Sequence, residues 1–277
     1  MNLWELFVAL ILGIVEGLTE FAPISSTGHM IIVDDILLHS KEIFTEPVAN
    51  TFKVVIQLGS ILAVVILFKE RFIHLLRLDK GKSEHQNQKA KLSLSKVIVG
   101  LIPAGVFGVI FEDYIDEYLF SVQTVIIGLI VGAVLMLIAD RLSSGKLITE
   151  TVDQITYKQA LGMGLFQCLG LWPGFSRSGS TIAGGVLLGM SHRAAADFTF
   201  IMAVPIMLGA SCLSLLKNWE YFTIEALPFF IVGFISAFVV ALIVVKFFLK
   251  LINRIKLVPF AIYRIVLAVL IYVVYLK

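Results

Sequence analysis

Apolar residues run along this chain in long blocks separated by short polar loops, a pattern typical of helices that cross a membrane. A spanning helix needs about 20 predominantly apolar residues. Six blocks reach that length: 49–68, 92–111, 118–139, 197–216, 226–246 and 257–276. The sequence therefore predicts an all-α polytopic membrane protein.

Two further apolar stretches, 4–38 and 158–190, are interrupted near their middle by proline, glycine and hydroxyl residues. The interruptions read APISSTGH at 22–29 and WPGFSRSGST at 172–181. Proline removes a backbone donor and glycine loosens a helix, so each stretch should form two half-helices. Irregular backbone persists at membrane depth only where protein or a water-filled cavity covers it. We therefore predict two re-entrant hairpins, each of which enters and leaves on one side.

The loop charges predict an orientation. The loops rich in lysine and arginine are 69–96, 141–158, 246–256 and the short loop that contains Arg193. The loops poor in basic residues are 39–48, 112–117 and 217–225. Basic loops stay in the cytoplasm. Six crossings and two hairpins put every loop on its expected side if both termini are extracytoplasmic. The first hairpin then enters from outside, and the second enters from the cytoplasm.

The two halves of the chain resemble each other at an offset of 151 residues. Ala9, Leu10, Gly13, Leu18, Ser25 and Gly28 match Ala160, Leu161, Gly164, Leu169, Ser176 and Gly179. The halves, 1–145 and 155–277, would each hold one hairpin and three crossings. Three crossings are an odd number, so the second repeat must be inverted relative to the first. Inverted repeats with broken helices are typical of transporters, and their ligand sites lie at the breaks.

Composition agrees with a membrane protein and removes other classes. The chain is 58% hydrophobic and 15% charged, against about 25% charged residues in average soluble proteins. The net charge is only +2, and no basic stripe suggests a nucleic-acid partner. Cys168 and Cys212 form no metal or redox motif.

The first break brings acidic and hydroxyl residues together. Glu16 and Glu20 are four residues apart, hence on one helix face. Two buried like charges are costly unless a cation lies between them or one is protonated. Carboxylate oxygens suit a hard divalent cation such as Mg²⁺ or Ca²⁺. The simpler alternative is a carboxylate pair that reaches the membrane interface.

Ser25, Ser26, Thr27 and His29 follow these carboxylates. The hydroxyls could satisfy backbone groups freed by Pro23, and His29 could be an ordinary core histidine. In the same hairpin as two carboxylates, however, the Ser26 and His29 pair is a candidate nucleophile and base.

The second break contains Arg177, the only basic residue between Lys158 and Arg193. A guanidinium fork suits phosphate oxygens. Hydroxyl donors surround it: Ser176, Ser178, Ser180 and Thr181. The alternative is a structural arginine paired with Glu16 or Glu20, which would not exclude phosphate binding.

Two other basic residues of the apolar segments receive a simpler interpretation. Lys53 and Arg264 lie near predicted helix ends, and long basic side chains there commonly extend to the headgroups. We expect Lys53 to do so at the outer face and Arg264 at the cytoplasmic face.

These motifs together resemble the undecaprenyl-diphosphate phosphatase family of bacterial bacitracin-resistance membrane proteins. The resemblance runs from the first apolar segment to the last. It rests on ExxxE at Glu16 and Glu20, SSTGH at 25–29 and PGxSRSxxT at 173–181. VVIQLGSILAVV at 54–65 and PFAIYR at 259–264 add to it.

The resemblance implies an enzyme of the bacterial plasma membrane that removes the terminal phosphate of undecaprenyl diphosphate. It also implies a divalent cation, resistance to bacitracin, an active site open to the outer face, and compatibility with a homodimer. Glu16 and Glu20 would bind metal or move protons, and Arg177 would clamp the diphosphate. Ser26 resembles the nucleophile, with His29 as its proton partner or as the attacking group. The remaining phosphate-binding side chains would be Ser25, Thr27, Ser176, Ser178 and Thr181.

A transporter or lipid flippase is the competing hypothesis. Glu16, Glu20 and His29 would then form an ion relay at the membrane midplane. A pure carrier needs no nucleophile beside a diphosphate clamp, which favours the phosphatase. A structural scaffold would not explain three costly charged groups inside the membrane.

Overall fold

The computed structural model describes residues 3–43, 45–76, 92–143 and 148–275, and every regular element among them is a helix. Six helices are long and apolar enough to cross a membrane. They are α4 (Glu46–Leu67), α6 (Leu94–Tyr118), α7 (Val122–Leu142), α10 (His192–Lys217), α11 (Leu227–Ile255) and α12 (Val258–Tyr275). The six predicted spans are therefore confirmed. The predicted loop at 112–117 is wrong, because α6 continues through it to Tyr118. Most of the predicted basic loop at 69–96, part of the loop at 141–158 and the extreme chain ends lie outside the described residues.

The ends of these helices differ from the predicted ends. Hydropathy indicates which residues lie within the membrane, whereas the first residue of a helix is set by its capping residue. α10 begins at His192 rather than at 197, since the Ser191 hydroxyl accepts a hydrogen bond from the Ala194 amide at 3.0 Å. α11 continues past the predicted end at 246 to Ile255, and two of its basic residues, Lys250 and Arg254, lie on the extra turns. It ends where Lys256 adopts a positive φ of 55°.

Both interrupted stretches are broken helices. The first consists of α1 (Leu3–Thr19), α2 (Ser26–Met30) and the π-helix η1 (Ile31–Leu38), followed by the short helix α3 (Ser40–Ile43). The second consists of α8 (Tyr157–Leu169) and α9 (Arg177–Leu187). The irregular segments between the arms cover 20–25 and 170–176, where the sequence places its proline and hydroxyl residues.

The two breaks have the same local geometry. Ser25 and Ser176 both adopt a positive φ, 71° and 69°, immediately before a helix. Each hydroxyl accepts a hydrogen bond from the amide three residues later, Gly28 at 3.4 Å and Gly179 at 3.2 Å. A left-handed conformation is uncommon for serine, so its occurrence at matched positions gives both helices the same cap.

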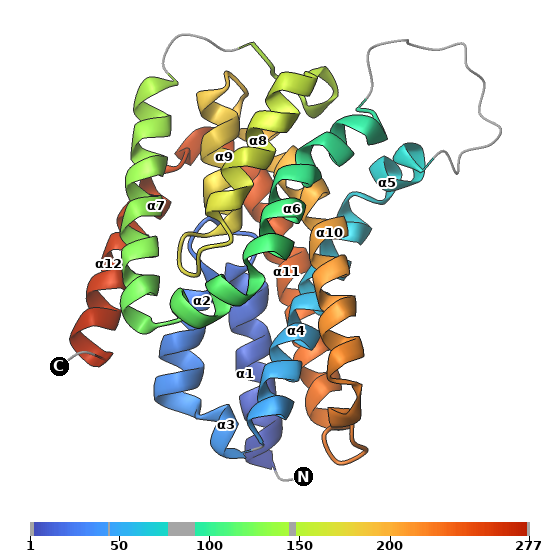
Figure 1. Cartoon of the computed structure of the whole chain (residues 1–277), viewed down its shortest axis with the longest axis vertical. Helices are drawn as coiled ribbons and strands as arrows, with labels where there is room; N and C mark the ends of the chain where they lie inside the picture. Colours follow the sequence, from blue (N-terminus) through green and yellow to red (C-terminus); the bar gives the residue numbers. More distant parts are fainter. Residues whose placement is uncertain (1–2, 44, 77–91, 144–147, 276–277) are drawn as a thin grey trace.

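The broken helices occupy opposite halves of the molecule (Figure 1). α1, α2 and α3 lie in the lower half, α8 and α9 lie in the upper half, and the loops after α1 and α8 approach each other near mid-height. α1 packs against α11 and α4, while α8 packs against α6 and α9. The long helices surround them, with α7 and α12 on the left of Figure 1 and α4, α10 and α11 on the right.

Glycines allow the broken helices to approach the long ones closely. A Cβ atom on Gly13 of α1 would collide with the Gly233 carbonyl oxygen of α11. A Cβ atom on Gly164 of α8 would collide in the same way with the Gly100 carbonyl oxygen of α6. Small residues at such crossings let backbones pack in direct contact, which favours helix association in membranes.

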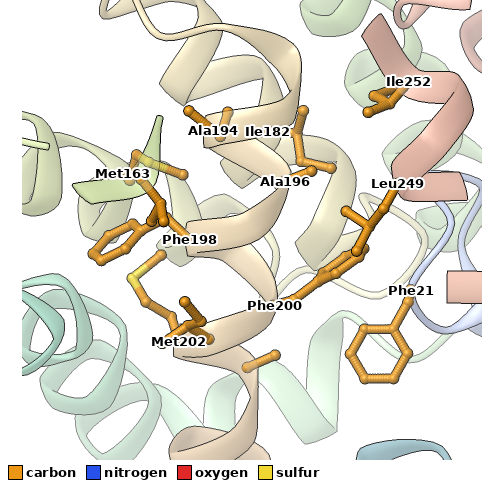
Figure 2. Close-up of a cluster of buried hydrophobic side chains, with 14 of the residues drawn as sticks. Phe21, Met163, Ile182, Ala194, Ala196, Phe198, Phe200, Met202, Leu249 and Ile252 are labelled. Carbon is orange, nitrogen blue, oxygen red and sulfur yellow. The ribbon is translucent and has the colours of Figure 1, made fainter. Parts of the chain in front are cut away.

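A buried apolar cluster fixes the first break against the helices around it (Figure 2). Phe21, which follows Glu20, is 1% exposed and packs edge-on against Phe200 of α10, with ring centroids 5.3 Å apart. Leu249 and Ile252 of α11 and Met163 of α8 belong to the same cluster. The cluster therefore holds the chain on the carboxyl side of Glu20 in one place.

Outside the spans, Asp153 connects three segments. Its carboxylate accepts hydrogen bonds from Arg71 of α5 (Lys69–Leu75) and from the Leu92 amide, the latter at 3.0 Å. Asp153 itself lies in the short helix η2 (Val152–Gln154). Burial raises the pKa of Asp153, but these two hydrogen bonds and the Arg71 charge together hold it below its ordinary value.

Replacement Asp153→Asn should lower the thermal unfolding temperature of the purified protein at neutral pH. Because the folded-state pKa is lowered, the carboxylate contributes stability above its unfolded pKa of about 4 and loses it as pH falls through the lower folded value. The difference in unfolding temperature between Asp153→Asn and the unsubstituted protein should therefore become smaller at acidic pH. Asp113→Asn, at an exposed position, serves as the control. An equal difference at every pH would contradict this account of Asp153.

Candidate active site

Glu20 joins the two breaks. Its Oε1 accepts a hydrogen bond from Arg177 Nη2 at 3.0 Å, and its Oε2 accepts one from Ser26 Oγ at 2.7 Å. Ser178 Oγ adds a second link by donating to the Ala22 carbonyl at 3.1 Å. Residues 157 positions apart in the chain thus form one polar cluster. Of the pairings considered from the sequence, Arg177 with Glu20 is the one present.

Arg177 and Glu20 are largely withdrawn from solvent, with side chains 16% and 9% exposed. The guanidinium carbon also lies 5.9 Å from the centroid of the Phe21 ring, a cation–π distance. Arg177 Nη1 is buried and has no hydrogen-bond partner among the described residues. The ion pair therefore leaves one donor nitrogen of Arg177 available to another group.

Two cavities meet at this cluster and share Glu20, Ser26, Thr27 and Gln57 in their walls. The smaller cavity has a volume of about 270 Å³ and is lined by the second break, including Ser176 and Arg177. The larger has a volume of about 710 Å³. Its polar lining continues from Glu16 to Asp35, Lys41, Glu46, Asn50 and Lys53. Ser26, between the two cavities, is open to both.

Glu16 is a buried carboxylate in the wall of the larger cavity, 5% exposed. No hydrogen-bond donor or ion-pair partner contacts it among the described residues. No cluster of three or more His, Cys, Asp or Glu side chains that could hold a metal occurs within the described ranges. The carboxylates of this wall nearest in the chain to Ser26 are Glu16 and Glu20; Asp35 and Glu46 line it as well.

The predicted hydroxyl residues fall into two groups. Thr27 lines both cavities, and Ser25 and Ser176 line the smaller one. Ser178 and Thr181 line neither. Ser178 bridges the breaks, and Thr181 Oγ1 donates to the Arg177 carbonyl at 2.8 Å, which holds the first turn of α9.

His29 points away from both cavities toward α12. Its Nδ1 lies 2.7 Å from the Ser25 carbonyl, and its Nε2 lies 2.7 Å from the Tyr263 hydroxyl. A carbonyl oxygen can only accept, so Nδ1 carries the proton, and Nε2 of the neutral ring accepts from Tyr263. The rings stack with centroids 5.6 Å apart. The hydrogen-bond partner of Ser26 Oγ is thus Glu20 and not His29.

The prediction that Arg264 extends to the headgroups is wrong. Arg264 is 0% exposed, and its Nη2 donates to the Gly174 carbonyl at 2.9 Å and to the Gly128 carbonyl at 3.1 Å. Gly132 and Gly179 leave room for the guanidinium, since a Cβ atom on either would collide with it. Arg264 therefore binds a carbonyl of the second break, Gly174, and a carbonyl of α7, Gly128, inside the protein.

Lys53 was also expected at the interface, and this too is wrong. Its ammonium lies 2.8 Å from Asp34 Oδ2 and 3.6 Å from Asp35 Oδ1, in the wall of the larger cavity. Asp34 is 1% exposed, and a buried carboxylate requires a nearby cation. The Asp34-Asp35 dipeptide in the first stretch was the available signal.

Sequence reasoning gave no role to Gln57 and did not single out Gln167. Gln57 lines both cavities, and Gln167 lines the smaller one while only 1% exposed. The repeat offset of 151 residues would have found Gln167, because it aligns this residue with Glu16.

The fold and this cluster define a multi-pass membrane protein with a buried polar site where two helix breaks meet. The chain belongs to the bacitracin resistance protein BacA family, whose model matches residues 9–270. A relative in Geobacillus sp. (strain WCH70) is 70% identical over 275 residues, 99% of this chain and 100% of the relative. Another in Bacillus subtilis (strain 168) is 68% identical over 270 residues, 98% of each chain. Both bear the name undecaprenyl-diphosphatase. The family predicted from the motifs is thereby confirmed.

Arg264→Met should loosen the second break, because the Gly128 and Gly174 carbonyls lose a buried charged donor. Trp172 reports on this break, since its Nε1 donates to the Thr124 carbonyl at 3.0 Å. With Trp4 and Trp219 replaced by Phe, acrylamide should quench Trp172 fluorescence more strongly in the variant. The unfolding temperature should fall by several degrees, for a loss of about 1–3 kcal/mol.

Arg254→Met makes the same substitution at an exposed arginine and should change neither quantity. Unchanged quenching in Arg264→Met would mean that Arg264 does not hold the break.

Proposed function

We propose that this chain is an integral membrane phosphatase that hydrolyses undecaprenyl diphosphate to undecaprenyl phosphate and inorganic phosphate. The enzyme recycles the lipid carrier of peptidoglycan precursors in the bacterial plasma membrane and confers bacitracin resistance. The observation that carries this proposal is the buried Ser26–Glu20–Arg177 cluster between two cavities. The identity of the substrate is inferred from full-length relatives named undecaprenyl-diphosphatase, at 68–70% identity.

Ser26 is the nucleophile in this proposal, and Glu20 is its base. The Ser26 oxygen attacks the terminal phosphorus, and its proton passes to Glu20 Oε2, 2.7 Å away. The bond from that phosphorus to the bridging oxygen breaks, and undecaprenyl phosphate leaves with the electron pair. Water then attacks the phosphoserine and releases inorganic phosphate, restoring the serine. Arg177 orients the diphosphate and stabilises the charge that develops on its oxygens.

A divalent cation, Mg²⁺ or Ca²⁺, would be held by Glu16 and Glu20 in the wall of the larger cavity. Mg²⁺ is commonly bound by one or two carboxylates together with substrate phosphates and water, and Glu16 is a buried carboxylate without another partner. Such a cation would neutralise negative charge on the diphosphate. His29 keeps the Ser25 backbone in position through its Nδ1 hydrogen bond, rather than acting on Ser26.

We also propose that 1–145 and 155–277 are inverted repeats and that the broken helices are re-entrant hairpins. The packing of α1 on α11 has its counterpart in the packing of α8 on α6, and each crossing has a glycine pair. The contact of α2 with α12 has its counterpart in that of α9 with α7. The matched serine caps add to this support.

In this orientation both termini and the larger cavity face the outside. Lys41 and Glu46 line that cavity near α3, at the lower end of Figure 1, where the basic-poor connection between α10 and α11 also lies. The substrate headgroup therefore enters from the outer face, and phosphate leaves there. A homodimer remains a prediction.

A transporter or flippase is the second candidate, favoured by the two joined cavities at the breaks. A carrier has no use for a hydroxyl hydrogen-bonded to a carboxylate beside an arginine. The two candidates separate on whether phosphate is released.

Purified protein in detergent should release phosphate from undecaprenyl diphosphate. EDTA should abolish release, and Mg²⁺ or Ca²⁺ should restore it. Arg177→Ala and Glu20→Gln should each lower the rate by at least about 100-fold. The first removes the charge that stabilises the transition state, and the second removes the base that accepts the Ser26 proton. Lys217→Ala, at an exposed position, is the control.

No release by well-folded protein with metal restored would reject the phosphatase and leave the transporter. Release at the normal rate by Arg177→Ala would reject the site.

A further inference from the structure

Gln167 is a buried amide without a partner. It lies on α8, is 1% exposed, and neither its Nε2 nor its Oε1 has a hydrogen-bond partner among the described residues. Gln159 on the same helix shows the contrast, since its Nε2 donates to Thr149 Oγ1 at 2.9 Å and to the Leu188 carbonyl at 3.1 Å. A buried amide that lacks such bonds costs stability. Its partner is therefore to be sought outside the polypeptide.

The smaller cavity is where that partner would lie. Gln167 lines it, together with Arg177, whose Nη1 is also buried and unpartnered. Among the described residues, Glu20 is the only acidic residue in this wall, and both of its oxygens already accept hydrogen bonds. The buried donors without a partner in this wall are thus the two amide N–H groups of Gln167 and Arg177 Nη1, which suit anionic oxygens.

The offset of 151 residues pairs Gln167 with a residue that favours a ligand of opposite charge. Position 16 in the first repeat is Glu16, and position 167 in the second is Gln167. Glu16 lines the larger cavity, where a carboxylate favours a cation. Gln167 lines the smaller cavity, where a neutral amide next to arginine favours an anion.

We propose that Gln167 is a substrate-binding residue whose amide, together with Arg177 Nη1, holds phosphate oxygens in the smaller cavity. This inference rests on the proposed function for the identity of the lipid, but its ligand chemistry is the phosphate group itself. Gln167 adds a buried neutral amide donor beside the charged guanidinium of Arg177.

Two substitutions separate this role from its rivals. Gln167→Leu removes unpartnered polar atoms, so stability without ligand should stay equal or rise while phosphate binding weakens by about 10-fold or more. Gln167→Glu places a negative charge beside the anion and should weaken binding further. A cation-binding role for Gln167 predicts the reverse for Gln167→Glu, and a purely structural role predicts lost stability in Gln167→Leu.

The test is a titration with inorganic pyrophosphate at fixed Mg²⁺, followed by the fluorescence of Trp172, which also lines this cavity. The protein carries Trp4→Phe and Trp219→Phe. Gln123→Leu, at an exposed position, is the matched control and should bind as the parent does. The parent should bind, Gln167→Leu should bind at least about 10-fold more weakly, and its unfolding temperature without pyrophosphate should not fall.

Equal affinity of the parent and Gln167→Leu would overturn the inference, as would a parent that binds no pyrophosphate. A fall in unfolding temperature of Gln167→Leu would assign a structural role and overturn it too. Failure of the proposed function has a different signature, because pyrophosphate would still bind while undecaprenyl diphosphate would yield no phosphate.

Discussion

The ion pair between Arg177 and Glu20 is the constraint around which this molecule is organised. Each charge lies between packed helices with little access to solvent, and either alone would be strongly unfavourable there. The two residues come from breaks in separate halves of the chain. The pair is therefore satisfied only when both breaks meet, and the same meeting brings Ser26 to the carboxylate and leaves one guanidinium nitrogen free.

Several features far from the pair serve to hold it. Glycine contacts let α1 approach α11 and let α8 approach α6, so each half-helix is carried on a long helix. Phe21 anchors the first break in the apolar cluster, and Arg264 anchors the second through the Gly174 carbonyl. Rigid supports of this kind keep catalytic groups in position when substrate binds. The polar site is thus built on packed elements although its residues lie in irregular segments.

The sequence predicted the coarse fold well because hydropathy reports directly on membrane depth. It also predicted the breaks, since proline and glycine within an apolar stretch are rare and costly signals. The pairing of Arg177 with Glu20 was considered only as the alternative to a phosphate clamp, and the structure contains that pair. The sequence could not predict directions of side chains. His29 faces Tyr263 rather than Ser26 because of how a five-residue helix is rotated. Arg264 is buried because distant glycines make room for it, a three-dimensional property without a local pattern.

The central claim is that two half-helices entering from opposite faces meet at one site, and labelling of introduced cysteines tests it most directly. With Cys168 and Cys212 replaced by Ala, single cysteines at Leu3, Lys41 and Tyr157 lie at exposed positions flanking the two hairpins. A membrane-impermeant maleimide should label Leu3→Cys and Lys41→Cys on intact cells, and Tyr157→Cys only after permeabilisation. Labelling of Leu3→Cys and Lys41→Cys from opposite faces would contradict the account, as would labelling of Tyr157→Cys from outside.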